Sequence, residues 1–201
     1  MPYCLVCKKH FISHSFFLDI SKINICQKCY HSLPILLKKE IMFGVECFFI
    51  YSYVYPIPEL LKDLKIKNDI ALSTIFLSPF RLILKSKYRG YIILPVPSNK
   101  GSDKKRGFNH INEIAKTLNL EICNAFYKKK VYKQSDKRMS ERHMINKIIG
   151  CDFTKLNNNK KYLIIDDIMT SSNTIKACVE CLLNQKFKKI KVLVIANNFK
   201  K

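Results

Sequence analysis

Two adjacent carboxylates followed by a run of hydroxyl and amide side chains stand out between residues 166 and 174. Asp166 and Asp167 end an apolar segment, and Thr170, Ser171 and Thr174 lead into a sequence of helical periodicity. The N-terminus of a helix presents unpaired N–H groups and partial positive charge, so hydroxyl donors at that point suit the binding of a phosphate. The carboxylates could accept hydrogen bonds from sugar hydroxyls or help to hold Mg²⁺. The same residue types also serve as ordinary helix caps and turns, so on their own they leave both interpretations open.

Nine cysteines include four whose spacing is typical of a structural metal site. Two Cys-x-x-Cys pairs are separated by eighteen residues and comprise Cys4, Cys7, Cys26 and Cys29. Four thiolates can close a tetrahedron around Zn²⁺ and leave no open position, so we expect a structural zinc ion rather than a catalytic one. The alternatives are lost ligands, an iron–sulfur site, or a nearby histidine acting as ligand. Cys178 and Cys181 repeat the spacing within a helical pattern, where we interpret them as small apolar residues on a buried face.

The charge of the chain is strongly positive and unevenly distributed. The 201 residues contain 36 Lys and Arg against 15 Asp and Glu, a net charge of +21, and 48% of them are hydrophobic. That hydrophobic fraction excludes wholesale disorder. Residues 98–161 carry 16 basic and 6 acidic side chains, or +10, which predicts a polyanionic ligand such as nucleic acid or a phosphorylated small molecule. A lysine-rich genomic composition is the alternative explanation for most of the excess.

The opening residues contain no basic stretch followed by an apolar one, so we expect a cytoplasmic protein with reduced thiols. The most apolar stretch, residues 41–58, contains Glu46 and ends in prolines. We therefore expect a core strand there and no membrane span.

The apolar pattern predicts a chain that alternates strands and helices. Strands are expected over residues 45–55, 91–97, 121–127, 162–166 and 191–196. Helices are expected over residues 35–41, 57–65, 70–87 with a break at Pro79, 109–118, 140–149 and 174–184. Such alternation implies an α/β fold with a mostly parallel sheet flanked by helices, and ligands of these sheets bind beyond the carboxyl ends of the strands.

Four motifs, in this order along the chain, resemble one branch of the type I phosphoribosyltransferases. They are the Cys4 module, Pro95-Val96-Pro97, Arg106-Gly107-Phe108-Asn109, and the segment 166–174, which resembles the loop that binds 5-phosphoribosyl-1-pyrophosphate (PRPP). The combination is similar to the ComF family, which is associated with DNA uptake in competent bacteria. The resemblance implies a type I phosphoribosyltransferase-like domain over residues 45–201, preceded by a small zinc-ribbon-like module over residues 1–44.

The resemblance also implies a role for each part of the site. Asp166 and Asp167 would bind the ribose hydroxyls of PRPP, and the 5-phosphate would lie in the loop formed by Thr170, Ser171, Ser172, Asn173 and Thr174. The turn that includes Pro97 and Ser98 would face the pyrophosphate, with Lys104, Lys105 and Arg106 in a mobile basic loop beside it. Arg138 and Arg142 would form a further basic segment. Mg²⁺ and cations on the leaving group would stabilise the transition state of pentosyl transfer, with Asp166, Asp167 and Arg106 as the catalytic residues.

Two residues depart from the family pattern. Ser172 stands where the loop normally has glycine, a residue used where φ is positive or the backbone approaches a phosphate closely. Asn173 tolerates the left-handed region better than most residues, so the loop could close with a shifted arrangement. His110 stands where the family commonly has glutamine, and we expect an exposed side chain without a role.

Two hypotheses follow from these residues. The first is a PRPP-binding phosphoribosyltransferase domain, catalytic or vestigial, that acts in DNA uptake or processing, with a helicase of the uptake machinery as a further partner. The second is an accessory protein that binds single-stranded DNA through its zinc module and basic stretch, with aromatic faces for the bases. Its DNA-binding residues would be Lys104, Lys105, Arg106, Lys128, Lys129, Lys130, Arg138 and Arg142.

Overall fold

Five strands form one sheet in the order β1-β2-β7-β6-β3 in the computed structural model, which describes residues 3–11, 24–98, 100–129 and 149–198. The strands are β1 (Ile35–Met42), β2 (Val45–Ser52), β3 (Tyr91–Pro95), β6 (Lys161–Met169) and β7 (Ile190–Asn197). The pairs β2–β7, β7–β6 and β6–β3 are parallel, and β1 joins β2 antiparallel at one edge. The expected mostly parallel sheet is therefore confirmed.

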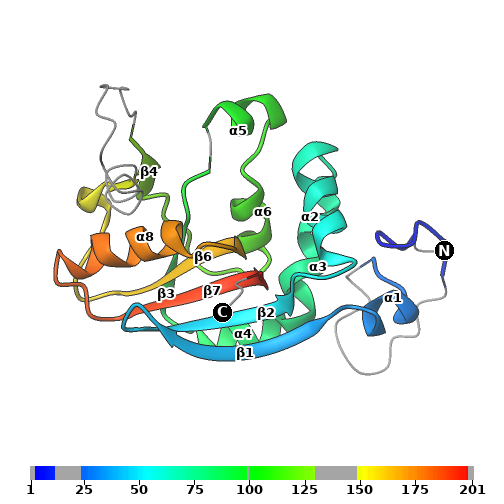
Figure 1. Ribbon diagram of the computed structural model, residues 1–201, viewed down its shortest axis with the longest axis horizontal. Coiled ribbons are helices and arrows are strands. Elements are labelled where there is room, and N and C mark those ends of the chain that lie inside the picture. The colour runs from blue at the N-terminus through cyan, green and yellow to red at the C-terminus, as the bar shows by residue number, and fades with distance from the viewer. Residues whose placement is uncertain (1–2, 12–23, 99, 130–148, 199–201) are drawn as a thin grey trace.

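Helices flank this sheet and gather at the edge where the parallel strands end. They are α2 (Ile57–Ile66), α3 (Ser73–Leu77), α4 (Arg81–Lys87), α5 (Lys100–Arg106), α6 (His110–Lys116) and α8 (Asn173–Leu183). Figure 1 shows α8 running along β6, while α6 and α2 stand next to the arrowheads of β6 and β7 and α5 lies above α6. The alternation of strand and helix thus places three helices around the carboxyl edge of the sheet.

The predicted helix over residues 35–41 is wrong, because this segment is the strand β1. Phe43 and Gly44 both have positive φ, 55° and 75°, and Met42 pairs directly with Val45. A two-residue turn with two positive φ values matches the twist of an antiparallel hairpin. The hairpin attaches β1 to the main sheet, so we propose that the N-terminal module ends before β1 rather than at residue 44.

The long predicted helix over residues 70–87 is divided into shorter pieces. The 3₁₀ turns Ile70–Leu72 and Ser78–Phe80 flank α3, and α4 follows the second turn. Pro79 lies in that second turn, as expected from its inability to donate an N–H within a helix. The predicted helix over residues 140–149 lies outside the described residues except for Ile149, which begins a strand.

Two smaller units complete the described chain. The short strands β4 (Phe126–Lys128) and β5 (Ile149–Cys151) form an antiparallel pair beside α8, followed by a 3₁₀ turn over Phe153–Lys155. The cysteine module contains α1 (Gln27–His31) and lies at one end of the molecule (Figure 1). No helix among the described residues is both long and apolar enough to span a membrane.

Candidate functional site

The acidic pair lies on the last part of β6, and its two carboxylates face different helices. Asp166 and Asp167 are both buried, with 9% and 7% of their surface exposed. Successive residues of a strand point to opposite faces of the sheet. Accordingly, Asp166 lines a small hollow at the start of α8, whereas Asp167 contacts residues of α2 and α6. The structure therefore assigns different surroundings to two residues that the sequence presents as a pair.

The predicted phosphate loop forms that hollow. Its lining includes Thr170, Ser171, Ser172, Asn173 and Thr174. No side chain caps the N-terminus of α8, so the N–H groups of its first turn are available to an anion. Ser172 has φ 57° and ψ −6°, a left-handed conformation that glycine adopts more readily than serine. Asn173 is the first helical residue, so the expected shift of the turn onto Asn173 does not occur.

Asp167 has two partners that the sequence did not reveal. Its Oδ2 atom accepts a hydrogen bond from His110 Nε2 at 3.0 Å and forms an ion pair with Lys65 Nζ. His110 is buried, with 7% of its surface exposed, so the expectation of an exposed histidine without a role is wrong. Within the described part of the chain, the contacts of the Asp167 side chain with His110 and Lys65 both use Oδ2.

Arg106 closes these contacts into a ring of four residues. Arg106 Nη1 lies 2.8 Å from His110 Nδ1, and Arg106 Nε donates to the carbonyl oxygen of Lys65 at 3.0 Å. Because a guanidinium only donates, His110 Nδ1 must accept, and the imidazole proton therefore resides on Nε2 and points to Asp167. Lys65, Arg106, His110 and Asp167 thus link α2, α5, α6 and β6.

The pKa values of the two carboxyl groups are shifted in opposite directions. Burial raises the pKa of Asp166 well above its usual value, and the charge of Asp167 adds to this effect. Burial also opposes ionisation of Asp167, but the His110 hydrogen bond and the Lys65 charge outweigh it and lower the pKa of Asp167. Of the two carboxyl groups, Asp167 is therefore the one whose surroundings favour the negative charge.

The residues predicted to face pyrophosphate lie beside the acidic pair. Val96 N–H bonds to the carbonyl of Ile165, so the turn at Pro97 and Ser98 continues next to the end of β6. The expected mobile basic loop is wrong, because Lys104, Lys105 and Arg106 belong to the helix α5. Side-chain contacts tie this helix to the turn and to the start of α6: Ser98 Oγ donates to Asp103, and Asn109 Nδ2 donates to Ser98 Oγ at 2.7 Å and to Asp103 at 3.0 Å.

The basic residues predicted to bind DNA do not all lie together. Lys104 and Lys105 are exposed on α5, and Lys128 and Lys129 are exposed on and just after β4. The two pairs of lysines therefore belong to two different elements, α5 and β4, both in the upper part of Figure 1. Lys130, Arg138 and Arg142 lie outside the described residues.

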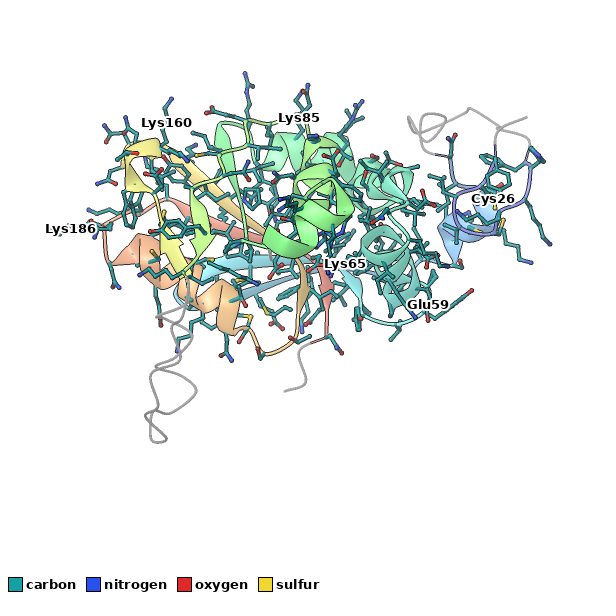
Figure 2. All side chains as sticks on the ribbon, turned by 90° about the horizontal axis from the view of Figure 1, so that it is seen from above. Cys26, Glu59, Lys65, Lys85, Lys160 and Lys186 are labelled. Carbon is teal, nitrogen blue, oxygen red and sulfur yellow. The ribbon has the colours of Figure 1, made fainter. Side chains whose placement is uncertain are left out.

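A cavity of about 390 Å³ adjoins the acidic pair. It is lined by Tyr53, Pro58, Glu59, Leu61, Lys62, Lys65, Ile66 and Ile168. Ile168 also lines the hollow of the phosphate loop, and Lys65 connects the cavity to Asp167. Figure 2 shows Lys65 near the centre of the molecule, whereas Glu59 lies at its edge.

The four predicted zinc ligands converge in the N-terminal module. The sulfur atoms of Cys4, Cys7, Cys26 and Cys29 all lie within 4.8 Å of one another. Cys26 N–H donates to Cys4 Sγ at 3.3 Å, a bond that favours the thiolate. Burial raises the pKa of Cys4, but the N–H groups of Cys26, Cys7 and Val6 lower it to about 7. The donor set and its spacing fit a tetrahedral zinc ion.

Comparisons with known proteins find relatives for much of this chain. Residues 104–201 match the family model of the phosphoribosyl transferase domain. Competence protein ComFC of Bacillus subtilis (strain 168) is 26% identical over 141 residues, which cover 68% of this chain and 57% of that protein. Competence protein ComFC of Streptococcus pneumoniae (strain ATCC BAA-255 / R6) is 28% identical over 153 residues, which cover 74% of this chain and 66% of that protein. The matched region thus spans less than two thirds of either relative.

A solved hypoxanthine phosphoribosyltransferase from Staphylococcus aureus is 16% identical, with a TM-score of 0.40 and coverage of 62% of each chain. The parallel sheet, the acidic pair at its carboxyl edge and the matched family model together define a type I phosphoribosyltransferase domain. With the ComFC relatives and the cysteine module in front of this domain, the chain is similar to ComF-like proteins.

Proposed function

We propose that the protein binds PRPP at the carboxyl edge of the sheet. The N–H groups at the start of α8 would hold the 5-phosphate, and Asp166 and Asp167 would accept hydrogen bonds from the ribose hydroxyls. The observation that carries this proposal is the uncapped N-terminus of α8, whose hollow Asp166 lines, next to Asp167 with its lowered pKa. Both features suit a ligand that presents a phosphate next to hydroxyl donors.

The pyrophosphate of PRPP would lie toward the turn at Pro97 and Ser98. The exposed Lys104 and Lys105 of α5 carry positive charge on that side of the site. Mg²⁺, when bound with PRPP, would neutralise the pyrophosphate as it leaves. Pentosyl transfer is the corresponding reaction class, with Asp166, Asp167 and Arg106 as the catalytic residues.

Calorimetric titration of Mg²⁺ and PRPP tests the binding proposal. We expect saturable binding to the wild type and its loss in the double variant Asp166→Asn, Asp167→Asn. Lys160→Met, at the far rim of the molecule (Figure 2), is the matched control and should bind as the wild type does. A wild type that binds no PRPP would exclude the proposal.

We also propose that the four cysteines bind one structural Zn²⁺. The convergence of the four sulfur atoms supports this assignment. Protein purified without chelator should contain one equivalent of zinc, and Cys26→Ser should lose it, whereas Cys47→Ser, which alters a buried thiol of β2, should retain it. A zinc content below about half an equivalent in the wild type would count against coordination by four cysteines.

The biological setting that we propose is DNA uptake in the cytoplasm, as the names of the two ComFC relatives suggest. A direct role in binding single-stranded DNA is the second candidate, with a helicase of the uptake machinery as partner. It is favoured by the exposed Lys104 and Lys105 and by Tyr127, 41% exposed, beside Lys128 and Lys129.

Salt dependence distinguishes the two ligands. Binding of a single strand should weaken steeply as salt rises, in proportion to the phosphates neutralised, whereas binding of PRPP in an enclosed site should weaken less. Fluorescence anisotropy of a labelled oligonucleotide measures this, with Lys104→Ala, Lys105→Ala as the test variant. An unchanged affinity in that variant would contradict the contribution of α5.

A further inference from the structure

Asp167 is held by Lys65, which lies outside every motif discussed above, and by His110, which directly follows the motif Arg106-Gly107-Phe108-Asn109. Lys65 comes from α2 and His110 from α6, and both contact the same carboxylate oxygen, Oδ2. The side chain of Asp167 is 10% exposed, that of His110 8% and that of Lys65 28%. A carboxylate this deeply buried keeps its charge only where charged or strongly polar donors compensate for lost water.

The two donors contribute differently to this compensation. His110 is a neutral donor, because Arg106 occupies its Nδ1 atom. Arg106 is itself directed to His110, to Asp103 and to the carbonyl of Lys65. Among the described residues, the Lys65 ammonium is therefore the full positive charge in direct contact with Asp167.

We propose that Lys65 is a positioning residue for PRPP: by holding Asp167 Oδ2, it keeps this carboxylate charged and turns Oδ1 toward a ribose hydroxyl. This inference rests on the proposed binding of PRPP. Lys65 acts here through Asp167, with which its ammonium forms an ion pair, and it is not among the residues that line the hollow of the phosphate loop. The class of contact that it serves is the hydrogen bond between carboxylate and ribose hydroxyl.

The ring of contacts explains why a lysine from α2 can perform this task reliably. The backbone of Lys65 is fixed by Arg106 Nε, and the same Arg106 fixes the imidazole of His110. Both donors to Asp167 are therefore oriented by one guanidinium. A long, flexible lysine side chain gains precision when its backbone and its target are held by the same residue.

A double-mutant cycle tests the proposal directly. Dissociation constants for PRPP with Mg²⁺ would be measured for the wild type, Lys65→Met, Asp167→Asn and the double variant. Lys65→Met retains the apolar stem and removes the charge, and we expect affinity to fall by roughly tenfold or more, as for a buried charge left without its partner. In the Asp167→Asn background the same substitution should cause no further loss, because Lys65 then has no carboxylate to hold.

Two further variants separate positioning from a general structural effect. Lys65→Arg should recover most of the affinity, since it restores a positive donor to Asp167. Lys85→Met, which alters an exposed side chain of α4, should bind PRPP as the wild type does. Inorganic phosphate, which needs only the loop, should bind equally to the wild type and to Lys65→Met. Thermal unfolding of each variant shows whether it is folded at the temperature of the titration.

The outcomes that overturn the inference differ from those that overturn the proposed function. Equal losses on removing Lys65 with and without Asp167 would show that Lys65 contacts the ligand itself and does not act through Asp167. An unchanged affinity in Lys65→Met would also refute the inference while leaving PRPP binding intact. If the wild type binds no PRPP, both proposals fail, and a coupling between Lys65 and Asp167 in the free energy of unfolding would then identify the contact as structural only.

Discussion

Replacing Ser172 by glycine should stabilise the protein in the absence of any ligand. Ser172 adopts φ 57°, and a side chain in the left-handed region costs roughly 1–2 kcal/mol relative to glycine. Glycine loses about 0.5–1 kcal/mol through the greater entropy of the unfolded chain. The substitution also removes the hydrogen bond from Ser172 Oγ to the carbonyl of Ser171, which is exposed and contributes about 0.5 kcal/mol at most. These terms sum to a net change in the free energy of unfolding between about −0.5 and +1.5 kcal/mol, with a midpoint of about 0.5 kcal/mol in favour of glycine.

The neighbouring Ser171 supplies a control that isolates the backbone effect. Ser171 is not among the residues with positive φ, so Ser171→Gly carries the entropy cost without relieving strain. The difference between the two variants should be about 1–2 kcal/mol in favour of Ser172→Gly. Urea unfolding, extrapolated to zero denaturant, measures it. Equal destabilisation by both glycines would show that Ser172 is not strained, and the backbone interpretation of the loop would be wrong.

The remaining predictions concern the acidic pair and a cysteine pair. Asp166→Asn should raise the free energy of unfolding at pH 7, because the raised pKa of Asp166 costs stability above the pKa that this residue has in the unfolded chain. Asp167→Asn should lower the free energy of unfolding by roughly 2 kcal/mol, because the lowered pKa of Asp167 adds stability in the same pH range. In the wild type, the contribution of Asp167 to stability should be lost as the pH falls below about 4. Acid unfolding of the wild type and of Asp167→Asn measures this loss. An Asp167→Asn variant as stable as the wild type at pH 7 would contradict the prediction. Cys181, whose pKa a hydrogen bond with Cys151 lowers to about 7, should react with iodoacetamide faster than the buried Cys178 at pH 7. Mass spectrometry of the labelled peptides checks this order, and faster labelling of Cys178 would refute it.

The parts of the fold that the sequence predicted are those with strong local signals. The strands β6 and β7 and the helix α8 follow apolar runs and helical periodicity, and the structure confirms them. The strand β1 was missed because Leu36, Leu37, Lys38, Lys39 and Glu40 individually favour a helix. Pairing with β2 overrides that preference, and the signal that could have revealed it is Gly44 in a two-residue turn.

The candidate site divides in the same way. Asp166, Asp167 and the loop that follows form one continuous segment, so their types and order could be recognised from the sequence. Lys65 and His110 reach Asp167 from distant parts of the chain; His110 is 57 residues away. Neither residue lies in a spacing that would suggest a shared site. Only the packing of α2 and α6 around the end of β6 shows that they belong to it.

The contact between Arg106 and the carbonyl of Lys65 also determines which basic side chains of α5 can face the proposed pyrophosphate site. Lys65 is the penultimate residue of α2, and its carbonyl is among those at a helix C-terminus that lack an intrahelical partner. Arg106 therefore acts as a C-terminal cap, and its charge offsets the negative end of the α2 dipole. In this arrangement Arg106 supports a neighbouring helix, whereas Lys104 and Lys105 of α5 are exposed to an approaching polyanion.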